Sequence, residues 1–173
     1  MNWYALHVAS NTDRQVMEKL AWAGIEGFYP HRNTMSKDRR RLVEEKFFPG
    51  YIFGRFDLAG QRRQVIAIPQ VLQILGWANR PVAIPDAEID SIRILVTSPA
   101  PSKPCGLLVG YGDRVRVKHG PLVGLEGYVT RIQRRTRVVV AVTMLPAARA
   151  VEVDGSALEL LEAAPQRTLL RAA

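Results

Sequence analysis

Cysteine and histidine are scarce in this chain of 173 residues. The one cysteine, Cys105, excludes an internal disulfide framework and any metal cluster built from cysteines, so a reducing compartment is expected. The three histidines, His7, His31 and His119, lie in separate segments, with no second histidine or cysteine at metal-ligand spacing. The sequence therefore predicts neither a metal site nor a cofactor.

Long apolar runs and catalytic motifs are also missing. No stretch approaches the ~20 apolar residues of a membrane helix, and the N-terminal run MNWYALHV lacks the basic and apolar regions of a secretory signal. We therefore expect a cytoplasmic protein. There is no G-x-S-x-G motif, no phosphate-binding glycine loop before a helix and no isolated carboxylate pair. These absences favour a binding protein over an enzyme.

Positive charge is abundant. The formal net charge is +8 and the sequence pI is about 10.1, which is consistent with a polyanionic partner such as nucleic acid. Most of the 24 basic residues are arginines, a bias that phosphate recognition and the base composition of the source genome explain equally well. The charge suggests a partner class without fixing it.

Residues 1–98 read as strand-helix-strand-strand-helix-strand-helix. Thr12 and Gln15 fit a capping box at the start of the first helix, and Gly24 fits its end. Residues 33–42 are polar and basic, so we expect an exposed hairpin tip or loop there. This order predicts an α+β sandwich with a mostly antiparallel sheet.

The composition changes near residue 98. Residues 99–107 are rich in proline and small residues, which favours an extended linker. Residues 108–164 contain short β-rich runs between Gly, Pro and charged turns, and a barrel of about five strands would close its own edges in so short a segment. Residues 165–173 are expected to be a tail.

Two strand-like runs, WYALHV and YIFGRF, divide their side chains by parity, because successive side chains of a strand point to opposite faces. One set comprises Leu6, Val8, Ile52 and Phe56, which, together with Phe47 outside the strands, we expect to be ordinary core. The opposite set comprises Trp3, Ala5, His7, Tyr51, Phe53 and Arg55. This second face is either a contact surface for a partner or is covered by a helix, and spacing alone supports both alternatives.

Several short motifs follow one another along the chain. They are WYALHV, GIEGFYP, FFPGYIF, PVAIPDAEI, the Pro-rich linker and GDRVRVKHGPLVGLEGYV, with VEVD near the end. From residue 3 to about residue 161, this series resembles the NusG family of transcription elongation factors, including its specialised antiterminator branch typified by RfaH. The resemblance implies an N-terminal NGN domain of α/β-sandwich type at residues 1–98 and a C-terminal KOW domain, a small five-stranded barrel, at residues 108–164.

The resemblance also implies an apolar patch that receives the tip of the clamp helices in the largest subunit of RNA polymerase. Carried over position by position, the patch consists of Trp3, Phe48, Tyr51 and Phe53, with Trp77 and Ile89 at its rim. If three rings each lost roughly 100 Å² of apolar surface, the gross gain would be about 7 kcal/mol. Association costs ~4 to 15 kcal/mol, so a second anchor is expected.

The family supplies that anchor at the start of the second helix, against the gate loop of the second-largest polymerase subunit. The matching residues are Gln61, Arg62 and Arg63, whereas RfaH-like members have a different polar triad there. Basic groups near the upstream edge are candidates for contact with non-template DNA, or alternatively form a solvated surface. They are Arg14, Lys19, Lys37, Arg39, Arg40 and Arg41.

The KOW motif contributes two further sets of residues. Gly120, Pro121, Gly124 and Gly127 are first of all turn formers, because tight turns in a small barrel need glycine. The loop Met144, Leu145, Pro146 and Ala147 matches the family's contact with Rho or a small-subunit ribosomal protein. Many members have Phe-Gly-Arg or Leu-Gly-Arg there, and the Leu-Pro-Ala of this chain favours a specialised factor.

Together these features predict a monomeric, non-enzymatic transcription elongation and antitermination factor. By bridging the polymerase cleft it would keep the clamp closed and increase processivity. Two alternatives remain: a general factor that also couples to Rho or the ribosome, and a ribosome- or RNA-associated KOW protein. The need for a DNA recruitment signal, and any covering of the patch by the KOW domain, are left open by the sequence.

Overall fold

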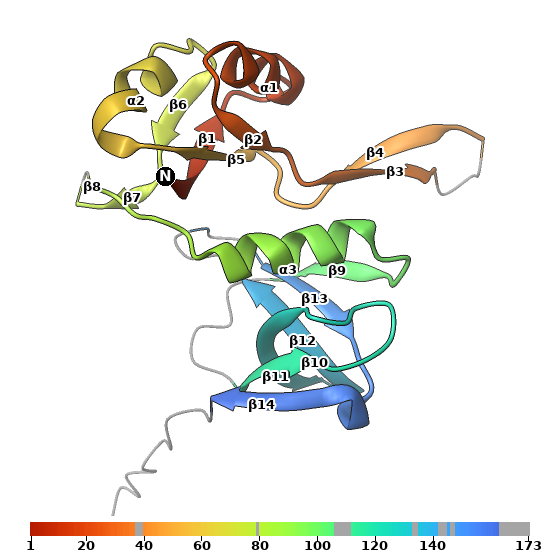
Figure 1. Ribbon diagram of the computed structural model, residues 1–173. Coiled ribbons are helices and arrows are strands. Elements are labelled where there is room, and N and C mark those ends of the chain that lie inside the picture. Colours follow the sequence, from red (N-terminus) through yellow and green to blue (C-terminus); the bar gives the residue numbers. More distant parts are fainter. Residues whose placement is uncertain are drawn as a thin grey trace, which may run out of the picture.

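The chain folds into two layers of strands with one helix, α3, between them (Figure 1). The computed structural model describes residues 1–36, 40–78, 80–105, 112–132, 135–141, 145 and 148–162. The N-terminal part contains β1 (Asn2–Val8), α1 (Asp13–Trp22), β2 (Glu26–Phe28), β3 (His31–Met35), β4 (Leu42–Lys46), β5 (Tyr51–Phe56), α2 (Leu58–Ile66), β6 (Val71–Ile74), β7 (Gly76–Trp77), β8 (Arg80–Pro81) and α3 (Asp86–Thr97). The C-terminal part contains β9 (Ser102–Cys105), β10 (Arg114–Val117), β11 (Glu126–Ile132), β12 (Arg135–Ala141), β13 (Ala148–Glu152), the short 3-10 helix Gly155–Ala157 and β14 (Leu158–Glu162).

The N-terminal sheet is antiparallel, with the strand order β2-β5-β1-β6. Its register pairs Ala5 with Phe53 and Leu6 with Ile52. The odd-numbered residues of β1 and β5 therefore share one face of the sheet, and the even-numbered residues share the other. Leu6 and Ile52 pack with α1 and α2 on one side, whereas Ala5 and Phe53 belong to a different buried cluster that contains α3. The predicted mixed α/β fold and the parity split are both confirmed.

The helix ends show one wrong prediction. The Thr12 hydroxyl does not cap α1 but donates to the carbonyl of Ala9 at 2.8 Å. Gly24 does follow the helix with a φ of +69°, the left-handed conformation that glycine adopts most easily. α2, in contrast, has a side-chain N-cap, because the Asp57 carboxylate accepts a hydrogen bond from the backbone N–H of Gly60 at 2.8 Å.

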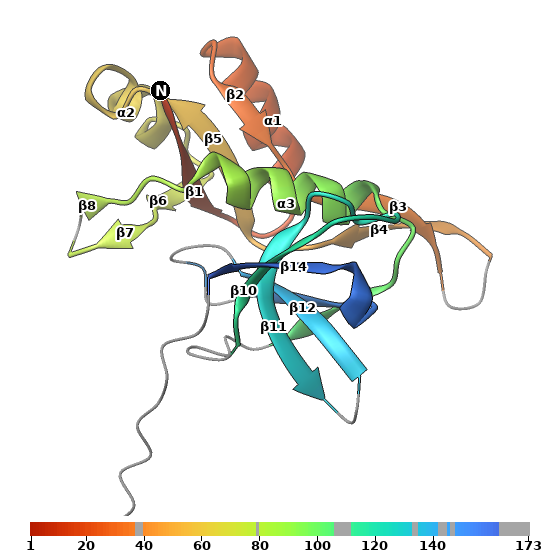
Figure 2. The same ribbon diagram turned by 60° about the horizontal axis from the view of Figure 1, so that its bottom comes forward.

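A two-stranded hairpin, β3–β4, projects from the N-terminal part (Figure 2). Its base is tied to α1 by the ion pairs Lys46–Asp13 at 2.5 Å and Arg14–Glu44 at 2.7 Å. Tyr29 donates a further hydrogen bond to Glu44 at 2.5 Å. These contacts set the direction of the hairpin, and its described turn residues include the exposed Arg40 and Arg41.

The C-terminal sheet differs from expectation at the linker. Its order is β14-β10-β11-β12-β13-β9, so Ser102–Cys105, which we expected to be extended spacer, is a sixth strand paired antiparallel with β13. A proline-containing segment is tolerated here because β9 lies at the edge of the sheet, where a missing ladder bond is least costly. In the described residues β9 and β14 are the two ends of the sheet.

One hydrophobic cluster runs through both parts of the chain. It contains Ile89, Ile92 and Leu95 of α3 together with buried residues of the C-terminal sheet, such as Val115 and Val138. α3 lies across those strands (Figure 2). The helix therefore contributes its apolar face to the core of the C-terminal part, and we call this arrangement the closed form.

Candidate functional site

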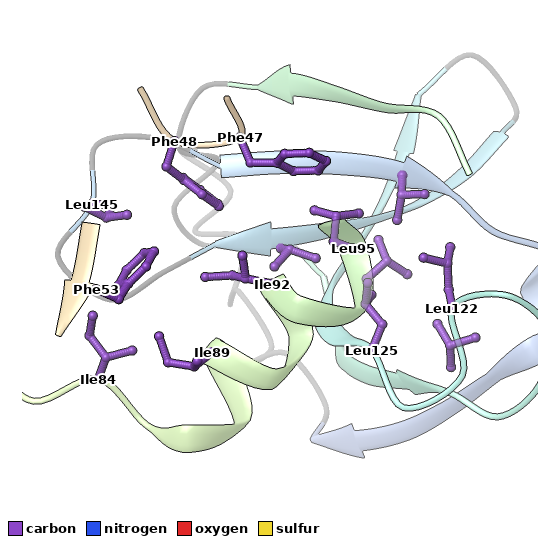
Figure 3. Packing of buried hydrophobic residues seen from close by; sticks show 14 of the residues in the cluster. Phe47, Phe48, Phe53, Ile84, Ile89, Ile92, Leu95, Leu122, Leu125 and Leu145 are labelled. Carbon is purple, nitrogen blue, oxygen red and sulfur yellow. The ribbon is translucent and has the colours of Figure 1, made fainter. Parts of the chain in front are cut away.

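The aromatic residues around the Pro-Gly turn gather at one place. Phe48 stands edge-on to Phe53, with ring centroids 6.3 Å apart. Ile84 and Ile89 complete the same corner, one from the segment before α3 and the other from its first turns (Figure 3). The Pro-Gly turn places Phe48 beside the strand that carries Phe53, because Gly50 at φ +83° allows the chain to reverse immediately after it.

The corner is buried, which corrects the expectation of an exposed patch. Phe53 is 0% exposed, and Leu145 of the C-terminal part, itself 1% exposed, lies beside Phe48 and Phe53 (Figure 3). The face of α3 that carries Ile92 and Leu95 is also covered, since both side chains pack into the C-terminal sheet. The rings thus lie where the two parts of the chain meet.

Three of the predicted patch residues do not behave as one group. Trp3 is buried within the N-terminal part: its carbonyl accepts from Ile84 N–H at 2.8 Å, and the guanidinium of Arg93 on α3 lies 5.3 Å from its ring. The alternative that a helix covers this face is therefore correct for Trp3. Tyr51 is half-buried and stacks on a histidine of β1, with ring centroids 5.4 Å apart. Trp77 is 76% exposed on β7, outside the cluster.

A polar junction beside the rings was missed by the sequence analysis. The guanidinium of Arg149, a residue 3% exposed, donates to Glu45 at 2.5 Å and to the Ser102 hydroxyl at 3.2 Å. Arg32 donates to the same Glu45 at 2.8 Å. Both guanidiniums lie over the ring of Phe47, at 4.4 Å for Arg149 and 5.2 Å for Arg32. Phe47 is buried as predicted, and two cations approach its ring.

A second polar contact joins α3 to the C-terminal sheet. The backbone N–H of Glu126 donates to the Ser91 hydroxyl at 2.9 Å, and that hydroxyl donates to the Ala87 carbonyl at 2.8 Å. No periodicity signalled this contact or the Arg149 junction, because each joins residues far apart in the sequence.

The predicted gate-loop residues lie on α2, away from this interface. Gln61 is engaged locally, since its side-chain oxygen accepts from the backbone N–H of Asp57 at 2.9 Å. Arg62 and Arg63 are exposed and line a shallow hollow together with Ile66. Two of the three predicted residues therefore present charge to the surface, and the third holds the helix start.

The basic residues proposed for DNA contact are spread over the surface. Arg14 pairs with Glu44, whose hydrogen bond raises the pKa of the guanidinium, and Lys19 donates to Gln70 at 2.9 Å. Arg40 and Arg41 lie at the hairpin turn, and the backbone N–H of Arg41 donates to the Ser36 hydroxyl at 3.3 Å. Lys37 and Arg39 lie outside the described residues.

The glycines of the predicted KOW turn occupy positions where a side chain would strain the backbone or collide with a neighbour. Gly120 and Gly124 have φ values of +91° and +84°, and a Cβ on Gly127 would lie 2.5 Å from the Val139 carbonyl oxygen. Pro121 lies in the same turn. Of the predicted partner loop the structure describes Leu145, while Met144, Pro146 and Ala147 lie outside the described residues.

The described part of the chain has neither a metal-binding cluster nor a membrane-spanning helix. It holds no group of three or more His, Cys, Asp or Glu side chains that would bind a metal ion. None of its helices is long and apolar enough to cross a membrane.

Comparison with known proteins gives a consistent result. Residues 1–93 match the family described as "Transcription termination factor nusG". The chain is 29% identical over 171 residues to the transcription termination/antitermination protein NusG of Pseudomonas aeruginosa, across 91% of this chain and 97% of that protein. Identity to the protein of the same name from Escherichia coli K12 is 30% over 124 residues, across 70% of this chain and 68% of that one.

Solved structures agree with the sequence matches. A structure described as "Domain interaction in Thermotoga maritima NusG" is similar to this chain with a TM-score of 0.51 and 26% identity. The match covers 93% of this chain and 97% of that one, so it includes both layers of strands.

Proposed function

Because the chain belongs to the NusG family, we propose that it is a non-enzymatic transcription elongation and antitermination factor that binds RNA polymerase. The observation that carries this proposal is the corner formed by Phe48, Phe53 and Ile89, which gathers the rings expected to receive the clamp helices. Leu145 of the chain's own C-terminal part covers that corner. We leave Trp3 out of the proposed patch, because α3 covers it within the N-terminal part through Arg93.

In this proposal the closed form does not bind polymerase through the corner. The C-terminal part, the KOW domain, first has to leave α3, and the polymerase then takes its place. A partner that binds only the open form shifts the population toward it, and the apparent affinity is reduced by the fraction of closed molecules. Binding at the clamp would then favour the closed clamp and continuous elongation without chemistry by this chain.

Opening has a second consequence, because Leu145 belongs to the loop proposed to contact Rho or a ribosomal protein. Its side chain is buried against Phe48 and Phe53 in the closed form. Polymerase binding would therefore release the loop, and a partner of the loop would promote polymerase binding by the same factor, since coupling between two binding events is reciprocal.

The second anchor is proposed at Arg62 and Arg63, which are exposed in the closed form. Non-template DNA would be contacted by the basic hairpin turn, including Arg40 and Arg41. The departure of residues 145–147 from the usual Phe-Gly-Arg or Leu-Gly-Arg supports a specialised member of the family over a general one.

A recovery experiment with immobilised RNA polymerase tests the proposal. In a Leu145→Ala background, Phe48→Ala should reduce recovery at least tenfold, because it removes a ring at the centre of the patch. Trp22→Ala is the matched control, since Trp22 is 85% exposed on α1, outside the proposed contacts. Equal recovery of both variants would refute the patch.

A second variant tests the anchor without touching the core. Arg62→Ala combined with Arg63→Ala removes two exposed charges and should weaken polymerase binding, with a smaller dependence on salt than that of the parent protein. An unchanged affinity at low salt would remove these residues from the contact.

A further inference from the structure

The connection between the two parts is shortened by β9. α3 ends at Thr97 and β9 begins at Ser102, so only residues 98–101 span the gap. Fully extended, four residues reach about 14 Å, at ~3.5 Å each. If β9 left β13, the connection would extend to Asp113, just before β10, and these 16 residues would reach about 55 Å. The pairing of β9 thus decides how far the C-terminal part can move.

Both ends of the short connection are held by cations that share one carboxylate. Arg32 donates to the Ser98 carbonyl at 2.9 Å, and Arg149 donates to the Ser102 hydroxyl at 3.2 Å. Each guanidinium also donates to Glu45 on β4. Glu45 therefore fixes the start of the connection through one arginine and the start of β9 through the other.

Of the two arginines, Arg149 is the one that connects the C-terminal part to the N-terminal part. It lies on β13 opposite Pro104 of β9, it is buried, and its Nε has no hydrogen-bond partner among the described atoms. A buried guanidinium with an incomplete set of acceptors depends strongly on its remaining carboxylate, because an unpaired buried charge is costly. Loss of Glu45 would leave Arg149 driven toward solvent, away from Ser102 and the ring of Phe47.

We propose that the pairing of β9 with β13 is a latch, and that Glu45, acting through Arg149, couples its release to separation of the domains. In the latched state the C-terminal part is confined near the end of α3. In the released state it moves away on the longer connection. The inference rests on the proposed function in one respect, that the two parts separate in use.

Amide hydrogen exchange, followed residue by residue by NMR in the full-length protein, tests the latch. Two probes report its two sides: the backbone amides of Ser102, Lys103 and Cys105 report β9, and the Glu126 amide, bonded to Ser91, reports the domain interface. Glu45→Gln should accelerate exchange at both probes by about tenfold or more relative to amides of β1. β9 should respond because Arg149, which bonds to both Glu45 and the Ser102 hydroxyl, connects the two.

Glu44→Gln is the matched control, because Glu44 is the neighbouring residue and pairs with Tyr29 and Arg14 inside the N-terminal part. It should leave both probes within about twofold of the parent. Ser102→Ala tests the coupling from the other side: it removes the Arg149 contact from β9 and should accelerate exchange of the Glu126 amide.

Two results would overturn the latch. If Glu45→Gln accelerates the Glu126 amide and leaves β9 unchanged, the domains separate while β9 stays paired. If neither probe responds, Glu45 does not hold the junction. No polymerase is present in the experiment, so these failures are distinct from failure of the proposed function.

Discussion

Leu145→Ala should open the protein and strengthen its binding to polymerase. Leu145 is 1% exposed and lies against Phe48 and Phe53, so its side chain stabilises the closed form and loses these contacts when the domains separate. Truncation of a buried leucine to alanine costs about 2.7 kcal/mol at the lower end of the measured range. Such a cost applied to the closed form alone increases the open-to-closed ratio by about 100-fold.

The assay is a titration of labelled protein with RNA polymerase, read by fluorescence anisotropy. Apparent affinity should rise by up to about 100-fold, levelling off once the open form dominates. Leu160→Ala is the control, because Leu160 is 58% exposed on β14 of the same domain. Equal affinities for the two leucine variants and the parent would show that covering by Leu145 does not limit binding.

Three predictions concern stability. Hydrogen bonds from Tyr29 and then Arg14 hold the pKa of Glu44 below its usual value near 4.5, so this carboxylate stabilises the fold above that pH and the contribution is lost as pH falls through the lowered pKa. Glu44→Gln should therefore lower the urea midpoint at pH 7, and the difference from the parent protein should shrink as the pH falls through the lowered pKa. Gly127→Ala should reduce the free energy of unfolding by about 2 kcal/mol, because its Cβ would meet a β12 carbonyl at 2.5 Å. Gly120→Ala should reduce the free energy of unfolding by about half as much in the same denaturation assay. Nothing lies within 4 Å of a Cβ at this position, so only the φ of +91° opposes the substitution.

Local patterns predicted the elements and the division of side chains between faces. Parity placed Ile52 on one side of the sheet and Phe53 on the other, and the register confirms it. Parity does not reveal what covers a face, which is why Trp3 was assigned to a surface that α3 and Arg93 occupy. Helical spacing likewise marked an apolar face on α3 without indicating that this face completes a second core.

The features that escaped prediction are long-range and polar. Glu45 and Arg149 are 104 positions apart, and neither has a neighbour pattern that selects the other. The strand β9 was missed for a related reason: proline and small residues argue against regular structure, and an edge position next to β13 overrides that preference.

The position of α3 in a single hydrophobic cluster shared by both parts of the chain links regulation to folding. In the closed form the shared cluster should make the whole chain melt in one cooperative transition, and an opened variant should melt in two. Any partner that draws the C-terminal part away also withdraws packing from α3. Substitutions that improve this core would therefore make a more heat-resistant protein and a less responsive one, so natural selection on the factor is expected to hold its packing short of the most stable arrangement.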